Sequence, residues 1–211
     1  MRGIRQHVNP LGLSFMEPRA LPLPRPAGLA LAAPVEVELG CADADFSFEL
    51  AAKHPDWWVI GLEIREQVLG RNRLRADKAG LKNLSFGYVN LNIDIDRVFA
   101  DRSVDRFHLL FPDPWFKQRH RKRRVIEPWL LAILRQQLRS GGELHFASDI
   151  FDVALAAMAE IEDPNNDHLG YRNLAGPWSF WRGNPFDAAS RRERITLRRQ
   201  QRVWRMRYLV P

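Results

Sequence analysis

The sequence predicts a doubly wound α/β fold built on a mostly parallel sheet. After Pro34, short apolar runs alternate with longer segments of helical periodicity, and this alternation is typical of βαβ units. The second apolar run, residues 57–64, is continuous enough to be a central strand that helices cover on both faces. With 211 residues the chain can bury a complete α/β core, so we expect a single domain over residues 35–211.

Residues 1–34 are expected to form an extended arm ahead of that domain. Proline recurs through this segment and is incompatible with a long helix. The prolines are Pro10, Pro18, Pro22, Pro24, Pro26 and Pro34.

The first half of the domain contains three expected strands, at 35–39, 57–64 and 84–90. Helices are expected between them at 46–54 and 65–79, the second ending near Gly80, and a short helix is expected around 94–100.

The second half continues with a strand at 104–111, closed by Pro112 and Pro114. A helix at 127–139 follows, with Pro128 in its first turn, where proline is tolerated. Gly141 and Gly142 are expected to turn the chain into a strand at 143–148. A helix at 151–162 and a final strand at 203–210 complete the pattern.

Composition narrows the classes of function. The net charge of +7 favours a polyanionic partner, because Lys and Arg bound to phosphates release counterions. Cys41 is the only cysteine, so neither an internal disulfide nor a zinc finger is possible, and a reducing cytoplasm fits. The sequence has no metal-ligand cluster, no apolar run near the roughly 18 residues of a membrane span, and no signal-peptide pattern.

A cofactor site is expected after the first strand. Gly40 lets the backbone pass close to a ligand, and Glu63 follows it by 23 residues at the end of the second strand, where a carboxylate can bind ribose hydroxyls. The intervening GCADAD segment carries acids and few glycines, which favours a nucleoside cofactor without phosphates. An ordinary tight turn and a surface glutamate remain the alternative.

A second group of residues follows the fourth strand, in FPDPWFKQRHRKRR (111–124). Asp113 is held between two prolines, and Trp115 separates it from six cations. An aromatic side chain beside cations is typical of an RNA-facing surface. The cations are Lys117, Arg119, Arg121, Lys122, Arg123 and Arg124. A second basic run, 190–208, could return to the same face or be a solvated helix face.

FPDPWFKQRHRKRR resembles the signature of the bacterial tRNA (guanine-N7)-methyltransferases, in which FPDPW precedes a lysine and an H-x-K-R-R run. VELG (37–40), GLEI (61–64), Asn90, SGGELHFASD (140–149) and an S-x-x-E segment follow the family pattern in order. The resemblance implies a Rossmann-like class I methyltransferase fold. Its sheet would have seven strands, mostly parallel, with an antiparallel C-terminal strand.

The same resemblance implies S-adenosylmethionine as cofactor and tRNA as partner, for a cytoplasmic enzyme that forms 7-methylguanosine, usually at position 46 of the variable loop. Asp113 would be the catalytic acid. Glu38, Gly40, Glu63 and Asn90 would bind the cofactor. Lys117, Asp149, Ser190 and Glu193 would place the target nucleotide, and the cations at 119–124 would bind RNA. The chain would be a monomer or a homodimer and need no metal.

One departure from the family pattern concerns the cofactor loop. The family motif is G-x-G-x-G, whereas this chain has Gly40, Ala42 and Ala44. If either alanine must adopt a positive φ, it costs roughly 1 kcal/mol. A tRNA-binding homologue without activity therefore remains an alternative. A small-molecule methyltransferase is a third, which the basic segment disfavours.

Overall fold

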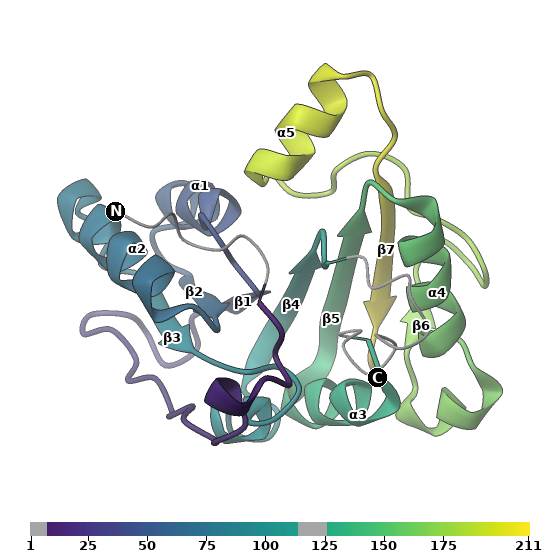
Figure 1. The fold of residues 1–211 in the computed structure, drawn as a ribbon, viewed down its shortest axis with the longest axis horizontal. Helices are drawn as coiled ribbons and strands as arrows, with labels where there is room; N and C mark the ends of the chain where they lie inside the picture. Colours follow the sequence, from purple (N-terminus) through teal and green to yellow (C-terminus); the bar gives the residue numbers. More distant parts are fainter. Residues whose placement is uncertain (1–7, 114–125) are drawn as a thin grey trace.

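The computed structural model describes residues 8–113 and 126–211, which form a seven-stranded mixed sheet with helices on both faces (Figure 1). The strand order is β3-β2-β1-β4-β5-β7-β6. Strands β1 to β5 pair in parallel, and β7 runs antiparallel to both β5 and β6. The predicted fold is confirmed. The strands are β1 Val35–Leu39, β2 Trp58–Glu63, β3 Leu84–Tyr88, β4 Val104–Leu110, β5 Leu138–Ser148, β6 Arg172–Asn173 and β7 Trp204–Leu209.

The first four α-helices lie where the apolar periodicity predicts them, and two of them carry local signals at an end. Pro128 occupies the first turn of α3, and Gly80 ends α2 in a left-handed conformation with φ 67°. The α-helices are α1 Asp45–Lys53, α2 Glu66–Ala79, α3 Pro128–Gln137, α4 Phe151–Ile161 and α5 Arg191–Arg198, and the 3₁₀ helices are η1 Leu13–Phe15, η2 Ile95–Arg97 and η4 Pro164–Leu169.

Alternation along the strands divides the core between the two faces of the sheet. Val35, Val37 and Leu39 of β1 pack into a core with α3 and α4, whereas the core on the other face contains α1 and α2. The even-numbered Glu36 and Glu38 therefore point to the α1 side. In this way β1 places a carboxylate near its carboxyl end, under α1.

Three features differ from the sequence prediction. The strand expected at 143–148 begins at Leu138. Gly141, with φ 76°, and Gly142 lie inside this strand, where a turn was expected. The helix expected at 94–100 is the single 3₁₀ turn η2. Strand β6 was not predicted, and α5 was expected only as one of two alternatives for residues 190–208. The sequence could not decide between them because RRERITLR has almost no apolar stripe, and its Leu197 is exposed.

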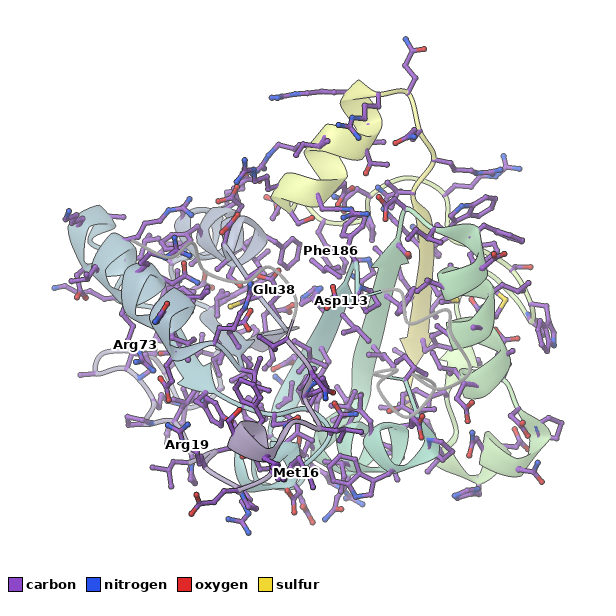
Figure 2. All side chains as sticks on the ribbon, viewed as in Figure 1. Met16, Arg19, Glu38, Arg73, Asp113 and Phe186 are labelled. Carbon is purple, nitrogen blue, oxygen red and sulfur yellow. The ribbon has the colours of Figure 1, made fainter. Side chains whose placement is uncertain are left out.

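Residues 8–34 contain only η1 and lie along the domain. The backbone N–H groups of Arg19 and Ala20 donate to one oxygen of buried Asp94, at 2.7 and 2.8 Å. The Arg25 guanidinium lies over the Trp58 ring, 4.9 Å from its centroid. Met16 and Arg19 lie at the lower end of the view, away from α5 (Figure 2). Within residues 8–113 and 126–211, no helix is both long and apolar enough to cross a bilayer.

Candidate functional site

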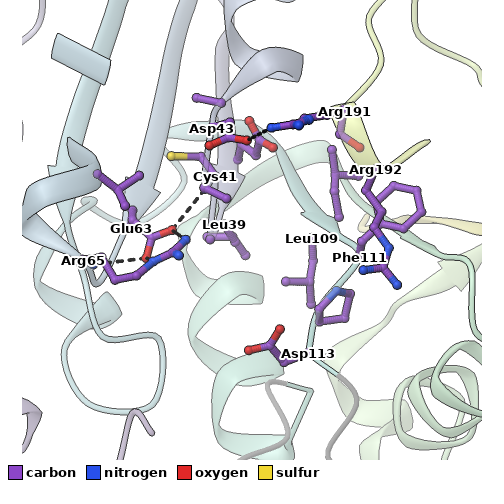
Figure 3. Close-up of a pocket in the computed structure, with 18 of the residues that line it drawn as sticks. Leu39, Cys41, Asp43, Glu63, Arg65, Leu109, Phe111, Asp113, Arg191 and Arg192 are labelled. Carbon is purple, nitrogen blue, oxygen red and sulfur yellow. Dashed lines mark hydrogen bonds and ion pairs between the residues drawn. The ribbon is translucent and has the colours of Figure 1, made fainter. Parts of the chain in front are cut away.

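A cavity of about 860 Å³ opens at the carboxyl ends of β1, β2, β4 and β5 and extends to α5 (Figure 3). This is the edge at which doubly wound sheets bind ligands, and the volume lies in the range of small-molecule sites. Most of the described residues that the sequence indicated as site residues line it. They are Glu38, Gly40, Glu63, Asn90, Asp113, Asp149 and Ser190.

The loop after β1 adopts the conformation that glycine favours, although two of its three key positions are alanine. Gly40 has φ 72°, Ala42 46° and Ala44 55°. Hydrogen bonds hold this shape: the Ala42 N–H donates to Glu63 at 3.1 Å, and the Asn72 carboxamide donates to the Ala42 carbonyl at 2.8 Å. The left-handed region costs an L-residue about 1 kcal/mol or more. The alanines therefore keep the glycine-loop path at the expense of stability.

Glu38 is a buried carboxylate at one wall of the cavity. It accepts hydrogen bonds from the Ser47 hydroxyl at 2.5 Å and the Ser47 N–H at 3.3 Å. Burial raises the pKa of Glu38 to about 8; the Ser47 hydrogen bonds oppose that rise, while the charges of Asp45 and Glu63 add to it. A cation bound beside Glu38 would favour the ionised carboxylate.

Glu63 is engaged by its neighbour Arg65 (Figure 3). The Arg65 guanidinium donates to both carboxylate oxygens, at 3.0 and 2.8 Å, and the backbone N–H groups of Ile64 and Arg65 donate at 2.9 and 3.1 Å. The hydrogen bonds with Glu63 raise the pKa of Arg65, and the negative charge of Asp113 also raises it. Arg65 is thus an electrostatic link between Glu63 and Asp113 that spacing alone could not reveal.

Asn90 connects the cavity to the N-terminal arm. Its side-chain amide donates to the carbonyls of Pro10 at 2.8 Å and Phe15 at 3.0 Å, and Val8 and Pro10 themselves line the cavity. The arm is consequently part of the cavity wall, a contribution that the sequence did not suggest.

On the opposite side, α5 closes the cavity. Arg192 donates to Asp149 at 2.9 and 3.3 Å, and Ser190 caps α5 by accepting from the Glu193 N–H at 3.2 Å. The buried Glu193 carboxylate turns inward to Arg205 and Asn184, and Glu193 is absent from the residues that line the cavity. Its position suits holding α5 in place.

The remaining predicted residues lie outside the described ranges. They are Lys117, Arg119, Arg121, Lys122, Arg123 and Arg124. Among the residues that the structure describes, no cluster of three or more His, Cys, Asp or Glu side chains could hold a metal ion.

Acids and arginines both line the cavity, and several of them pair. Arg65 binds Glu63, Arg191 lies 3.3 Å from Asp43, and Arg192 binds Asp149. The lining acids are Glu38, Asp43, Asp45, Glu63, Asp113 and Asp149, and the lining arginines are Arg65, Arg71, Arg191, Arg192 and Arg199. Because carboxylates at the ends of such strands accept hydrogen bonds from ribose hydroxyls, the cavity suits a nucleoside.

Comparisons with known proteins find methyltransferases. Residues 32–206 match the family model described as "Putative methyltransferase". The tRNA (guanine-N(7)-)-methyltransferase of Prochlorococcus marinus (strain NATL2A) is 32% identical over 209 residues, which cover 98% of this chain and 96% of that protein. The enzyme of the same name from Synechocystis sp. (strain ATCC 27184 / PCC 6803 / Kazusa) is 34% identical over 204 residues, covering 96% and 94%.

Solved structures of lower identity share the fold. A variant of the 16S rRNA (adenine(1408)-N(1))-methyltransferase from Catenulisporales acidiphilia, solved with its cosubstrate SAM, has a TM-score of 0.55 and 18% identity over 85% of this chain and 87% of that chain. A precorrin-6y C5,15-methyltransferase from Geobacter metallireducens GS-15 has a TM-score of 0.56 and 16% identity, covering 85% and 81%. The family model and the two sequence relatives each match most of this chain. This chain therefore belongs to the tRNA (guanine-N7)-methyltransferase family.

Proposed function

We propose that this chain transfers the methyl group of S-adenosylmethionine to N7 of a guanine in tRNA. The observation that supports this function most directly is that Asp113 lines the same cavity as Gly40 and Glu63. The acid from the RNA-facing motif and the cofactor loop thus meet, although they are separated by 73 residues, counted from 40 to 113.

In this proposal the cofactor half of the cavity is formed by β1, β2 and the segment after β3. Gly40 has no Cβ, and no protein atom lies within 4 Å of the position that a Cβ would take. A ligand can therefore approach the backbone closely at Gly40. Glu63 accepts hydrogen bonds from the ribose hydroxyls, in competition with Arg65. Glu38 carries negative charge near the positive end of the cofactor, and Asn90 holds the arm as the outer wall.

The chemistry asks little of the protein beyond position and charge. S-adenosylmethionine supplies an electrophilic methyl group on a sulfonium centre. Guanine N7 has an exposed lone pair and attacks without losing a proton, so the protein must hold the nucleophile in line with the methyl group. Asp113 accepts hydrogen bonds from the guanine edge and offsets the positive charge that develops on the purine.

The substrate half of the cavity is formed by the end of β5 and by α5. Asp149 and Ser190 position the target nucleotide, Glu193 anchors α5 through Arg205, and Lys117 contacts the nucleotide. The cations at 119–124 bind the phosphate backbone. We further propose position 46 of the variable loop as the target and the cytoplasm as the compartment, where tRNA is modified.

The test is incubation of the full chain with methyl-labelled S-adenosylmethionine and unmodified tRNA, followed by nucleoside analysis and mapping of the labelled position. The expected product is 7-methylguanosine. The strained Ala42 and Ala44 favour one other candidate, a tRNA-binding homologue that has lost cofactor binding. Salt-sensitive tRNA binding without detectable S-adenosylmethionine binding in calorimetry would establish that candidate and refute the enzyme.

A further inference from the structure

Three aromatic rings form a patch where α4 begins, which we call the aromatic patch: Phe151, Phe180 and Trp204. The Phe151 and Phe180 rings lie 4.7 and 4.9 Å from the Trp204 ring, centroid to centroid, and 6.1 Å from each other. Phe151 is 43% exposed at the first residue of α4. Phe180 and Trp204 are partly buried and pack against the core, so Phe151 is the ring that the patch exposes most.

One cation lies against the patch. The Arg202 guanidinium lies over the Trp204 ring, 4.3 Å from its centroid. In α5 and the residues after it, Arg191, Arg192 and Arg194 pair with carboxylates. No ion pair with a described carboxylate involves the later cations of this segment, Arg198, Arg199 and Arg202. Their charge is left for a partner outside the described residues.

Two short segments of chain connect the patch to residues that line the cavity. Asp149 lines the cavity two residues before Phe151, and Gln201 lines it three residues before Trp204. Three residues of extended chain span at most about 10 Å. In Figure 1 the start of α4 and the end of α5 lie at the same end of the sheet as the cavity, and α3 lies at the opposite end.

We propose that the aromatic patch stacks an unpaired nucleotide of the RNA substrate that neighbours the target base, while Arg202 binds its phosphate. This inference rests on the proposed function. Aromatic rings beside cations bind single-stranded nucleotides by stacking and charge, and a guanine in a folded tRNA must leave its stack to expose N7 inside a cavity. A second copy of this chain fits the patch poorly, because its own net charge of +7 would oppose the unpaired arginines.

The test compares tRNA affinity and methylation kinetics of the full chain with those of Phe151→Ala and Phe151→Trp. Stacking predicts that Phe151→Ala raises the Kd and KM for tRNA at least about fivefold, because one base stack is lost. Phe151→Trp keeps both within about twofold. The Kd for S-adenosylmethionine stays unchanged in both variants.

Trp129→Ala is the matched control, because Trp129 is 44% exposed on α3 at the far end of the sheet and should leave tRNA affinity unchanged. A tRNA Kd within twofold of the parent for Phe151→Ala would overturn the inference. So would a lowered oligomeric state in sedimentation with an unaltered tRNA Kd, since a second copy would then occupy the patch. If the parent chain methylates no tRNA but its tRNA affinity still falls in Phe151→Ala, the proposed function fails and the stacking surface stands.

Discussion

The cofactor loop makes a quantitative prediction, because two alanines there occupy backbone conformations suited to glycine. Ala42 has φ 46° and Ala44 has φ 55°, and both belong to the loop that links β1 to α1. Replacing each by glycine removes the clash between the Cβ and the following carbonyl oxygen. The two sites differ in burial, so the two substitutions should not have the same effect on stability.

The magnitudes follow from three contributions. Relief of the left-handed conformation gains about 1–2 kcal/mol at each site, and the greater freedom of glycine in the unfolded chain costs about 0.4–1 kcal/mol. Ala44 is only 1% exposed, so losing its methyl group costs roughly a further 0.8 kcal/mol. Ala42→Gly should therefore stabilise the protein by about 0.5–1 kcal/mol, and Ala44→Gly should be nearly neutral.

Denaturant and thermal unfolding measure both differences. For a chain of this size, Ala42→Gly should raise Tm by roughly 1–4 °C. In calorimetry the same variant should bind S-adenosylmethionine at least as tightly as the parent, because its change removes a methyl group that lines the cavity. Ala132→Gly is the control: Ala132 is exposed inside α3, and glycine there should cost about 1 kcal/mol.

Equal losses of stability in Ala42→Gly and Ala132→Gly would refute the reasoning, because the left-handed backbone at position 42 would then carry no cost.

Three further predictions concern buried charges. Burial raises the pKa of Glu38 to about 8, so the protonated carboxyl dominates below that pH and must ionise to meet a cation. The affinity for S-adenosylmethionine should therefore increase as the pH rises toward and through about 8. Calorimetry should find this pH dependence lost in Glu38→Gln. Asp94→Ala removes the acceptor of three backbone N–H groups and should lower the free energy of unfolding by at least about 3 kcal/mol. Limited proteolysis should then cut the released arm faster, and unchanged cleavage would contradict this role of Asp94. Arg205→Met leaves the buried Glu193 carboxylate uncompensated and should lower the free energy of unfolding in denaturant by about 3–5 kcal/mol. Adding Glu193→Gln to Arg205→Met should restore part of this stability, and no restoration would mean that the ion pair is not the cause.

The sequence was sufficient to predict the sheet and the convergence of its motifs. Apolar runs and turn residues located each central strand, and the ends of parallel strands share one edge, so Gly40, Glu63 and Asp113 were expected to meet there. They line one cavity. Their roles in binding and catalysis stay predictions that the experiments above test.

Contacts between distant parts of the chain could not be predicted. Asn90 donates to carbonyls 75 and 80 residues away, and no local pattern encodes that pairing. The sequence also gave no sign that Glu36 would be only 2% exposed. It accepts from Arg106 at 2.7 Å and lies 2.7 Å from His108, although glutamates that alternate with apolar residues in a strand commonly face solvent.

Arg65 was missed for a related reason. A cation two residues after an acidic strand end carries no local signal of a contact, whereas the folded chain turns its guanidinium back onto both oxygens of Glu63. The sequence predicted a cost at Ala42 and Ala44 if their φ is positive, but it could not predict that φ is positive there. The residue types allow several loop paths, and the hydrogen bonds from Asn72 and to Glu63 select one.

The most direct test of the catalytic geometry compares single-turnover methylation of tRNA by the parent chain and by Asp113→Asn, with S-adenosylmethionine affinity measured alongside. If Asp113 meets the purine as its positive charge develops, the rate of 7-methylguanosine formation falls about 100-fold or more while cofactor affinity stays within about twofold. A variant that methylates at the parent rate would contradict the account.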